Sequence, residues 1–86
     1  MFSIQYEKQA SRFLTKLTVK DDIKRIITEI EKLALNPFPT ETRRVESYND
    51  PKVFRTRVGD YRILYTVDHS QSELYILKID KRERVY

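Results

Sequence analysis

The sequence predicts an α+β domain in which two helices cover one face of a mostly antiparallel sheet. Alternating apolar and polar residues at positions 2–6 indicate an N-terminal strand, and two segments with apolar residues at helical spacing follow it. Three segments rich in β-branched and aromatic residues then form a meander that completes a four-stranded sheet. The expected order is β-α-α-β-β-β. At 86 residues, we expect one domain spanning residues 1–86, with a modest core.

The two expected helices form a helical hairpin with a short connection. The first is expected over residues 7–17, from an apolar stripe at Ala10, Phe13, Leu14 and Leu17. Thr18 and Asp21 have the spacing of a capping box and are expected to begin the second helix. Its apolar stripe runs from Ile23 to Ala34. Asn36 is expected to end it in the left-handed conformation, because the following Pro37 cannot continue a helix.

The remaining strands are separated by recognisable turns. Residues 40–52 are polar and are expected to be irregular, with Pro51 excluding a central strand there. Gly59-Asp60 suits a two-residue hairpin, and residues 68–72 form a longer hairpin loop. The strands themselves are expected over residues 53–58, 61–67 and 73–79.

Arginine is concentrated in the second half of the chain. The net charge is +4, and seven of the nine arginines follow residue 40. Strand alternation puts Arg55, Arg57 and Arg62 on the sheet face turned away from the helices. A guanidinium matches two phosphate oxygens, so this arrangement favours a nucleic-acid partner. The alternative is ordinary salt bridging to nearby acids, namely Glu46, Asp50, Asp60 and Asp80.

Composition narrows the function classes. The chain has no cysteine, so thiol nucleophiles and zinc–thiolate sites are excluded. The acids are scattered, and we expect neither a metal site nor a cofactor. No apolar run approaches the length of a membrane span, and we expect a cytoplasmic protein that does not bind a membrane. The single histidine, His69, is expected in a hairpin loop away from the arginines.

Several segments together resemble the RelE/ParE superfamily of bacterial and archaeal toxins. They are the first strand, the first helix from Ala10 to Leu17, Asn36-Pro37, the segment from Phe54 to Tyr65, and the ending Lys81-Arg-Glu-Arg-Val-Tyr86. The segment Arg-Val-Gly-Asp-Tyr-Arg-Ile-Leu-Tyr is the specific part of the match. The Lys-Arg…Tyr ending looks like the RelE branch, whose members cut messenger RNA in the ribosomal A site.

The resemblance implies a site and its partners. Arg62, Arg82 and Tyr86 match the family's catalytic positions. Residues expected to contact RNA are Arg44, Arg55, Arg57, Lys81 and Arg84. The sequence departs from the family's basic pattern at Glu46. The implied activity is a ribosome-dependent, metal-independent endoribonuclease that inhibits translation. The implied partners are a cognate antitoxin, ribosome-bound messenger RNA and ribosomal RNA.

With no histidine at the site, such an enzyme must rely on electrostatic stabilisation of the phosphorane by Arg62 and Arg82. Tyr86 has two possible roles: it stacks on a base, or it accepts the 2′-OH proton if arginines lower its pKa. Two other functions stay open on this pattern. One is a ParE-like protein that poisons DNA gyrase without cutting RNA. The other is an attenuated relative that only binds nucleic acid.

Overall fold

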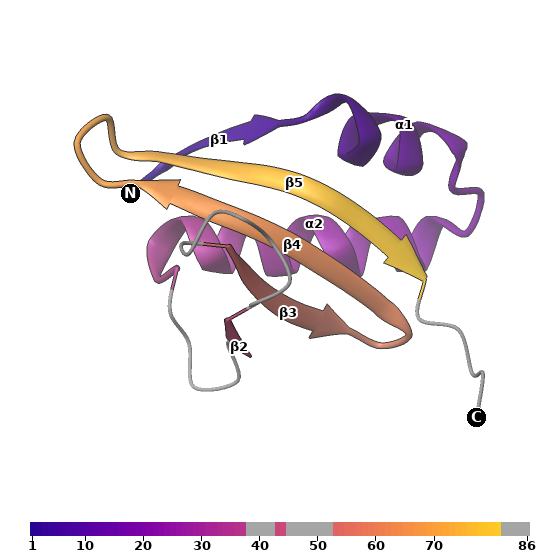
Figure 1. Ribbon diagram of the computed structural model, residues 1–86. Helices are drawn as coiled ribbons and strands as arrows, with labels where there is room; N and C mark the ends of the chain where they lie inside the picture. The colour runs from indigo at the N-terminus through magenta and orange to yellow at the C-terminus, as the bar shows by residue number, and fades with distance from the viewer. Residues whose placement is uncertain (38–42, 45–52, 82–86) are drawn as a thin grey trace.

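The computed structural model describes residues 1–37, 43–44 and 53–81, and it confirms the predicted fold class. The sheet order is β1-β5-β4-β3-β2, with β1 parallel to β5 and every other pair antiparallel (Figure 1). The elements are β1 (Ser3–Tyr6), α1 (Lys8–Lys16), α2 (Lys20–Leu35), β2 (Arg43–Arg44), β3 (Phe54–Val58), β4 (Tyr61–Asp68) and β5 (Glu73–Lys81).

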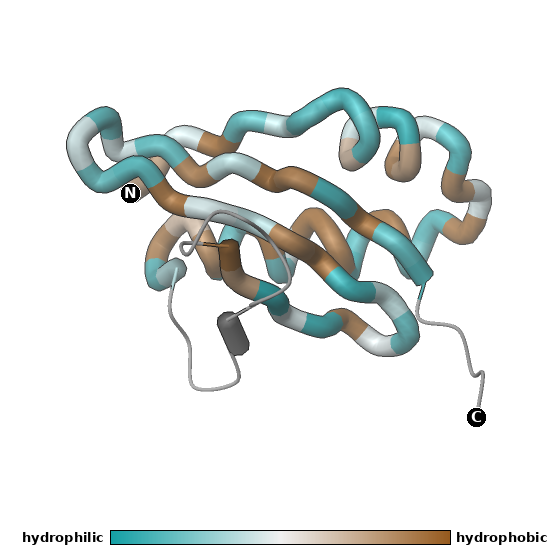
Figure 2. The backbone as a smooth tube through the Cα atoms, viewed as in Figure 1, coloured by the Kyte–Doolittle hydropathy of each residue, from teal (hydrophilic) through white to brown (hydrophobic). Residues whose placement is uncertain are grey.

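The core lies between the sheet and the two helices. Every second residue of β4, beginning with Tyr61, is buried, and β5 contributes Leu74, Ile76 and Ile79. Both helices pack apolar residues against this face, with Ala10 from α1 and a stripe from α2. Figure 2 shows hydrophobic and hydrophilic stretches alternating along the strands, as a sheet covered on one face requires. The buried residues of α2 are Ile26, Ile30, Leu33 and Ala34.

A glutamine in α1 completes the edge of β5 where β1 ends. Gln9 Nε2 donates to the Ile79 carbonyl at 3.0 Å, and the Ile79 amide donates to Gln9 Oε1 at 2.9 Å. β1 pairs with β5 only as far as Ile76. The Gln9 amide therefore satisfies both backbone groups of a residue beyond the last strand pair, and it ties α1 to the sheet.

Both predicted signals at the ends of α2 were wrong. The capping residue is Val19 rather than Thr18, and it makes no side-chain capping hydrogen bond. Leu17 and Val19 are both extended, so the helix begins only at Lys20, after the predicted capping box. Asn36 ends the helix with φ −144° rather than in the left-handed region. The residue before a proline is restricted to extended conformations, and Pro37 imposes that restriction here.

The predicted strand bounds hold to within two residues, and the sheet has a fifth strand at its edge in addition to the four that were predicted. β5 continues to Lys81, two residues beyond the expected end. Arg43 and Arg44 pair with β3 as a short edge strand, so the expectation of irregular structure was wrong for these two residues. Pro51 and the rest of residues 45–52 lie outside the described residues. The Gly59-Asp60 turn is confirmed, with Gly59 at φ +56°, a conformation that glycine adopts without strain.

Tyr61 ties the start of β4 to α2. Its hydroxyl donates to Asp22 Oδ2 at 2.6 Å, and its ring meets Phe13 of α1 edge to face at 5.9 Å between centroids. The hydrogen bond to Asp22 raises the pKa of Tyr61, with burial adding to the effect, because both favour the neutral phenol. One side chain thus joins both helices to the hairpin formed by β3 and β4.

Replacing Gln9 by alanine should lower the free energy of unfolding by about 1–2 kcal/mol, because two backbone groups of Ile79 lose their partners. Gln9→Glu should also destabilise the protein, since it keeps an acceptor for the Ile79 amide but loses the donor to the carbonyl. Urea unfolding measures both changes. Gln71→Ala, in the exposed loop, is the control. A loss as small for Gln9→Ala as for the control would contradict this account of the β5 edge.

Replacing Tyr61 by phenylalanine should lower the free energy of unfolding by about 1–2 kcal/mol at pH 7, because the bond to Asp22 is lost. The folded-state pKa is raised, so the phenol's contribution is complete below the unfolded pKa of about 10 and is lost as pH rises through the folded pKa. The wild type should therefore approach the variant in stability above pH 10. Urea unfolding at pH 7 and pH 11 tests this, and an unchanged difference would contradict it.

Candidate nucleic-acid interface

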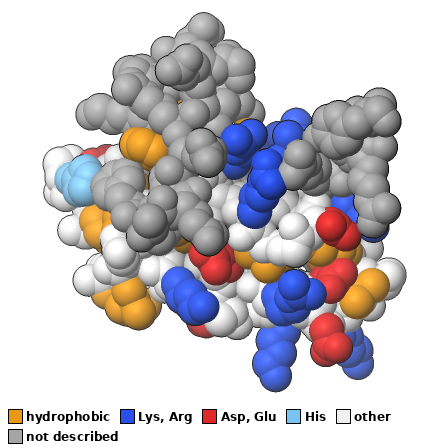
Figure 3. Space-filling view, turned by 90° about the horizontal axis from the view of Figure 1, so that it is seen from below, with side chains coloured by type: hydrophobic (Ala, Val, Ile, Leu, Met, Phe, Trp, Pro, Cys, Tyr) orange, Lys and Arg blue, Asp and Glu red, His pale blue; other side chains and the backbone are white. Residues whose placement is uncertain are grey.

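Basic side chains gather on the sheet face turned away from the helices. Strand pairing sets Arg57 opposite Arg62, and Arg55 opposite Leu64, which pairs with Lys78 on its other side. The prediction that Arg55, Arg57 and Arg62 share one face is confirmed by this register. Figure 3 shows Lys and Arg side chains gathered together, whereas acidic and basic side chains are mixed elsewhere in the view. We call the four residues Arg55, Arg57, Arg62 and Lys78 the basic face.

Strand alternation explains why these charges point outward. Thr56 lies between Arg55 and Arg57 in β3 and is buried, and Ile63 follows Arg62 in β4 and is fully buried. Because successive residues of a strand point to opposite faces, burying Thr56 and Ile63 forces their neighbours to the other side. The apolar core therefore fixes the placement of the arginines.

One acidic residue interrupts the basic face. Arg62 Nε donates to Asp80 Oδ1 at 3.1 Å, and Arg62 Nη2 donates to Oδ2 at 3.3 Å. Lys78 Nζ lies 3.8 Å from the same Oδ2. The salt-bridging alternative thus applies to Arg62 and Asp80, whereas Arg55 and Arg57 have no ion pair within the described part of the chain. Within the described residues, Arg55 and Arg57 therefore have no acidic partner, whereas Arg62 is held by Asp80.

The arrangement can bind an anion. A guanidinium carries five N–H donors, and Asp80 accepts from two of those on Arg62. The side chain of Arg62 is 38% exposed, so its remaining donors are accessible to a ligand. Residues directly opposite on paired strands have Cβ atoms about 4.5–5.5 Å apart, which brings Arg57 and Arg62 within reach of one phosphate.

The other predicted site residues are only partly described. Lys81 is exposed at the end of β5, and the backbone of Arg44 lies in β2 beside β3. Arg82, Arg84 and Tyr86 lie outside the described residues, as does Glu46. Their predicted contacts with RNA and their catalytic roles stay predictions.

Lys78 is the member of the basic face that sequence reasoning missed. The pairing of β4 with β5 is irregular between Leu64 and Tyr65, where the partner jumps from Lys78 to Ile76. This β-bulge inserts one extra residue in β5 and turns Lys78 to the outer face. The burial pattern shows the same bulge, because the buried positions of β5 change spacing from Leu74 and Ile76 to Ile79.

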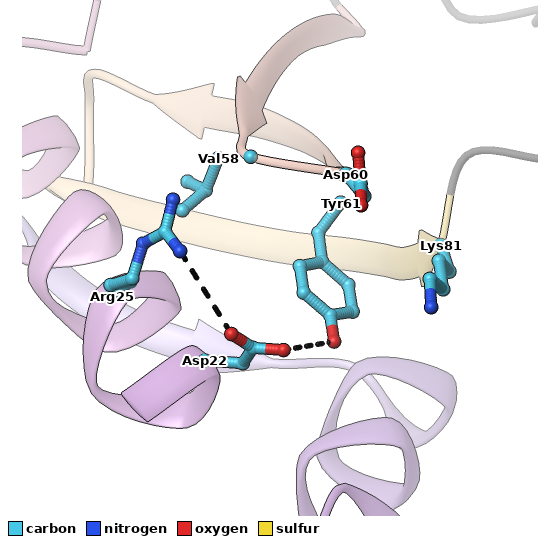
Figure 4. Close-up of a pocket in the computed structure, with 7 residues that line it drawn as sticks. Asp22, Arg25, Val58, Asp60, Tyr61 and Lys81 are labelled. Atoms are coloured by element: carbon cyan, nitrogen blue, oxygen red, sulfur yellow. Dashed lines mark hydrogen bonds and ion pairs between the residues drawn. The ribbon is translucent and has the colours of Figure 1, made fainter. Parts of the chain in front are cut away.

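A small cavity lies between the β3–β4 turn and α2. It holds about 210 Å³, and it is lined by residues of α2, the turn and the end of β5, including Asp22, Arg25 and Lys81. Figure 4 shows Asp22 between the guanidinium of Arg25 and the hydroxyl of Tyr61, with 3.9 Å between Arg25 Nη1 and Asp22 Oδ1. The Asp22 carboxylate is thus already engaged by two neighbours, and we assign this cavity a structural role in fastening the turn to α2.

The described tyrosines offer no activated base. Burial raises the pKa of Tyr6, and hydrogen bonds to carboxylates raise the pKa of Tyr61 and of Tyr75, whose partner is Glu73. A raised pKa makes the phenolate harder to form, so these side chains are poorer proton acceptors than a free tyrosine. The Tyr65 hydroxyl is buried and donates to the carbonyl of Pro37.

Other chemistry is sparse in the described part of the chain. His69 lies in the loop between β4 and β5, and its ring meets Phe2 edge to face at 5.7 Å between centroids. Among the described residues, no three His, Asp or Glu side chains form a group that could hold a metal ion. None of the described helices is long and apolar enough to cross a membrane.

Known proteins share this sequence pattern. The family model described as ParE toxin of type II toxin-antitoxin system, parDE, matches residues 4–86. A Methanocaldococcus jannaschii protein named Putative toxin RelE1 is 29% identical over 86 residues, which cover 99% of this chain and 94% of that protein.

Solved structures share the fold. A chain of the archaeal RelE-RelB complex from Pyrococcus horikoshii OT3 superposes with a TM-score of 0.80 at 29% identity, and the match covers 98% of each chain. The isolated E. coli RelE toxin gives a TM-score of 0.82 at 14% identity over 99% of this chain and 88% of that one, a likeness that concerns the fold alone. Because the family model spans nearly the whole chain, this protein belongs to the ParE toxin family of type II toxin-antitoxin systems, within the RelE/ParE superfamily.

Proposed function

We propose that this toxin is a ribosome-dependent endoribonuclease that cuts messenger RNA in the A site and inhibits translation. The observation that carries the proposal is the basic face, where Arg55, Arg57 and Arg62 lie together on the side of the sheet that the two described helices do not cover. The sequence similarity to two archaeal proteins named RelE supports the RelE branch over the ParE branch. The proposal adds Lys81, Arg44 and Arg84 as further contacts to the RNA backbone.

The proposed chemistry is an attack within the RNA. The 2′-oxygen forms a bond to the adjacent phosphorus, and the bond from phosphorus to the 5′-oxygen breaks, which leaves a 2′,3′-cyclic phosphate. Arg62 and Arg82 stabilise the charge on the phosphorane oxygens, and no metal ion is needed. Tyr86 either takes the 2′-OH proton or stacks on a base to hold the nucleotide. The leaving 5′-oxygen must gain a proton.

Weak proton transfer explains the proposed dependence on the ribosome. The described face supplies cations and hydrogen-bond donors, and a tyrosine is a poor base at neutral pH. Placing reactants in the correct geometry can supply several kcal/mol of a reaction barrier. A message held in the ribosomal A site, with contacts to ribosomal RNA, would receive that orientation from the ribosome. We therefore expect slow cleavage of free RNA.

A cognate antitoxin is the second proposed partner. A relative that is 29% identical over 98% of this chain was crystallised as a RelE-RelB complex. An antitoxin with an acidic or amphipathic segment would complement the charge of the basic face and block access by RNA. We place both proteins in the cytoplasm, where messages are translated.

Replacing Arg62 by alanine should reduce cleavage in a translating extract at least tenfold, because a charge-assisted contact contributes about 1.5–3 kcal/mol. Arg62→Lys should recover only part of the activity, since an ammonium keeps the charge but not the planar fork. The Arg62→Ala/Arg82→Ala double variant should be less active still. The measurement is the mapping of message ends on translated and untranslated RNA side by side.

Arg12→Ala is the matched control, because it removes the same charge from an exposed position in α1. Equal cleavage by the double variant and the wild type would overturn the assignment of these arginines. Intact messages together with gyrase-dependent DNA breaks would replace the proposal by the ParE-like alternative. If inducing expression of the protein does not arrest growth, the remaining interpretation is an attenuated relative that only binds nucleic acid.

A further inference from the structure

Asp80 is the one acidic residue that contacts the basic face within the described part of the chain. Its carboxylate touches two cations, with one oxygen shared between Arg62 and Lys78. A carboxylate here lowers the positive charge of a surface that is proposed to bind phosphate, so its presence needs a physical reason. Stabilisation of the fold is a weak reason, because the side chains of Arg62 and Asp80 are 38% and 30% exposed, and exposed ion pairs contribute little to the free energy of unfolding.

The geometry of the pair gives a better reason. Asp80 accepts from Nε and Nη2, which form one edge of the Arg62 guanidinium. The edge formed by Nη1 and Nη2 has no acceptor among the described residues, and it presents two parallel N–H groups of the kind that bind two phosphate oxygens at once. A bidentate contact on one edge fixes the plane of the guanidinium and therefore the direction of the other edge.

The backbone makes this contact rigid. Arg62 and Asp80 are directly opposite on β4 and β5, and the flanking residues Ile63 and Ile79 are a buried pair of the same register. Both side chains therefore start from strand positions that the core holds in place. Lys78 approaches the Asp80 carboxylate from the bulged part of β5, which adds a second cation on that side.

We propose that Asp80 is a positioning residue for Arg62: it binds the Nε–Nη2 edge of the guanidinium so that the Nη1–Nη2 edge faces the phosphate of a bound RNA. The role in cleavage rests on the function proposed above. Asp80 also competes with RNA for the same cations, so orientation is gained at the expense of affinity. The two effects have opposite signs, and this distinguishes positioning from a merely structural contact.

Asp80→Asn tests the proposal, because asparagine has nearly the same shape but neither the charge nor the second acceptor oxygen. It should bind a labelled single-stranded RNA oligonucleotide about two- to fivefold more tightly, from the loss of one nearby negative charge. It should nevertheless cleave translated message about tenfold more slowly, because Arg62 is no longer held in one plane. The expected result is a lower KM with a lower kcat, and Asp80→Glu should recover part of kcat.

Asp60→Asn is the matched control, since it makes the same change of charge at the exposed β3–β4 turn. It should leave kcat unchanged and alter RNA binding by less than Asp80→Asn. A fall in kcat with weaker binding, or equal effects in the two variants, would overturn the positioning role.

A third measurement does not depend on nuclease activity. In the wild type, the Nε–H group of Arg62 should give a slowly exchanging NMR signal, because it is held by Asp80 at 3.1 Å. That signal should broaden or exchange faster in Asp80→Asn and stay unchanged in Asp60→Asn. If the wild type cuts no message, the nuclease proposal fails, while this signal and the oligonucleotide affinity still decide whether Asp80 holds Arg62. An identical Arg62 signal in all three proteins would refute the inference.

Discussion

The alternation of β4 is the constraint on which the rest of the structure depends. This strand lies between β3 and β5, and its residues are in turn buried and partly exposed along its whole length. Because four side chains of β4 are buried on one face, the side chains between them must point to the other face. A shift of one residue in the pairing would move every side chain to the opposite face. The register of the core is therefore also the register of the basic face.

Adjacent residues of β4 show how closely the two faces are linked. Tyr61 points inward and bonds Asp22 of α2, whereas Arg62 points outward and bonds Asp80 of β5. The first contact fixes the hairpin against the helices, and the second fixes a guanidinium on the basic face. A disturbance of the core at this point would displace the proposed site, even though the core residues lie on the other face of the sheet.

Local patterns predicted the sheet face of Arg55, Arg57 and Arg62, because a period of two needs only neighbouring residues. They did not predict features that depend on distant ones. One error was local: Asn36 is extended because Pro37 follows it, and the expected left-handed cap did not take this restriction into account. Lys78 joins the basic face through a bulge that only the pairing of β4 with β5 defines. Asp80 was one of four acids that the sequence offered as salt-bridge partners for the arginines, and it is the pairing of β4 with β5 that places it opposite Arg62.

The basic face has several cations that can stabilise negative charge, but the described residues offer it little means of transferring a proton. Its described cations can stabilise negative charge on a phosphate, but its one described carboxylate already accepts from Arg62 and approaches Lys78. The pKa values of Tyr6, Tyr61 and Tyr75 are raised, so these phenols give up their protons less readily. An enzyme built in this way gains little on a freely moving RNA, because charge stabilisation acts only after the 2′-oxygen is aligned with the phosphorus. For the proposed reaction, the RNA would have to arrive already oriented, as a message held by a ribosome would be. The charges and pKa values of the described residues thus agree with the proposed dependence on the ribosome.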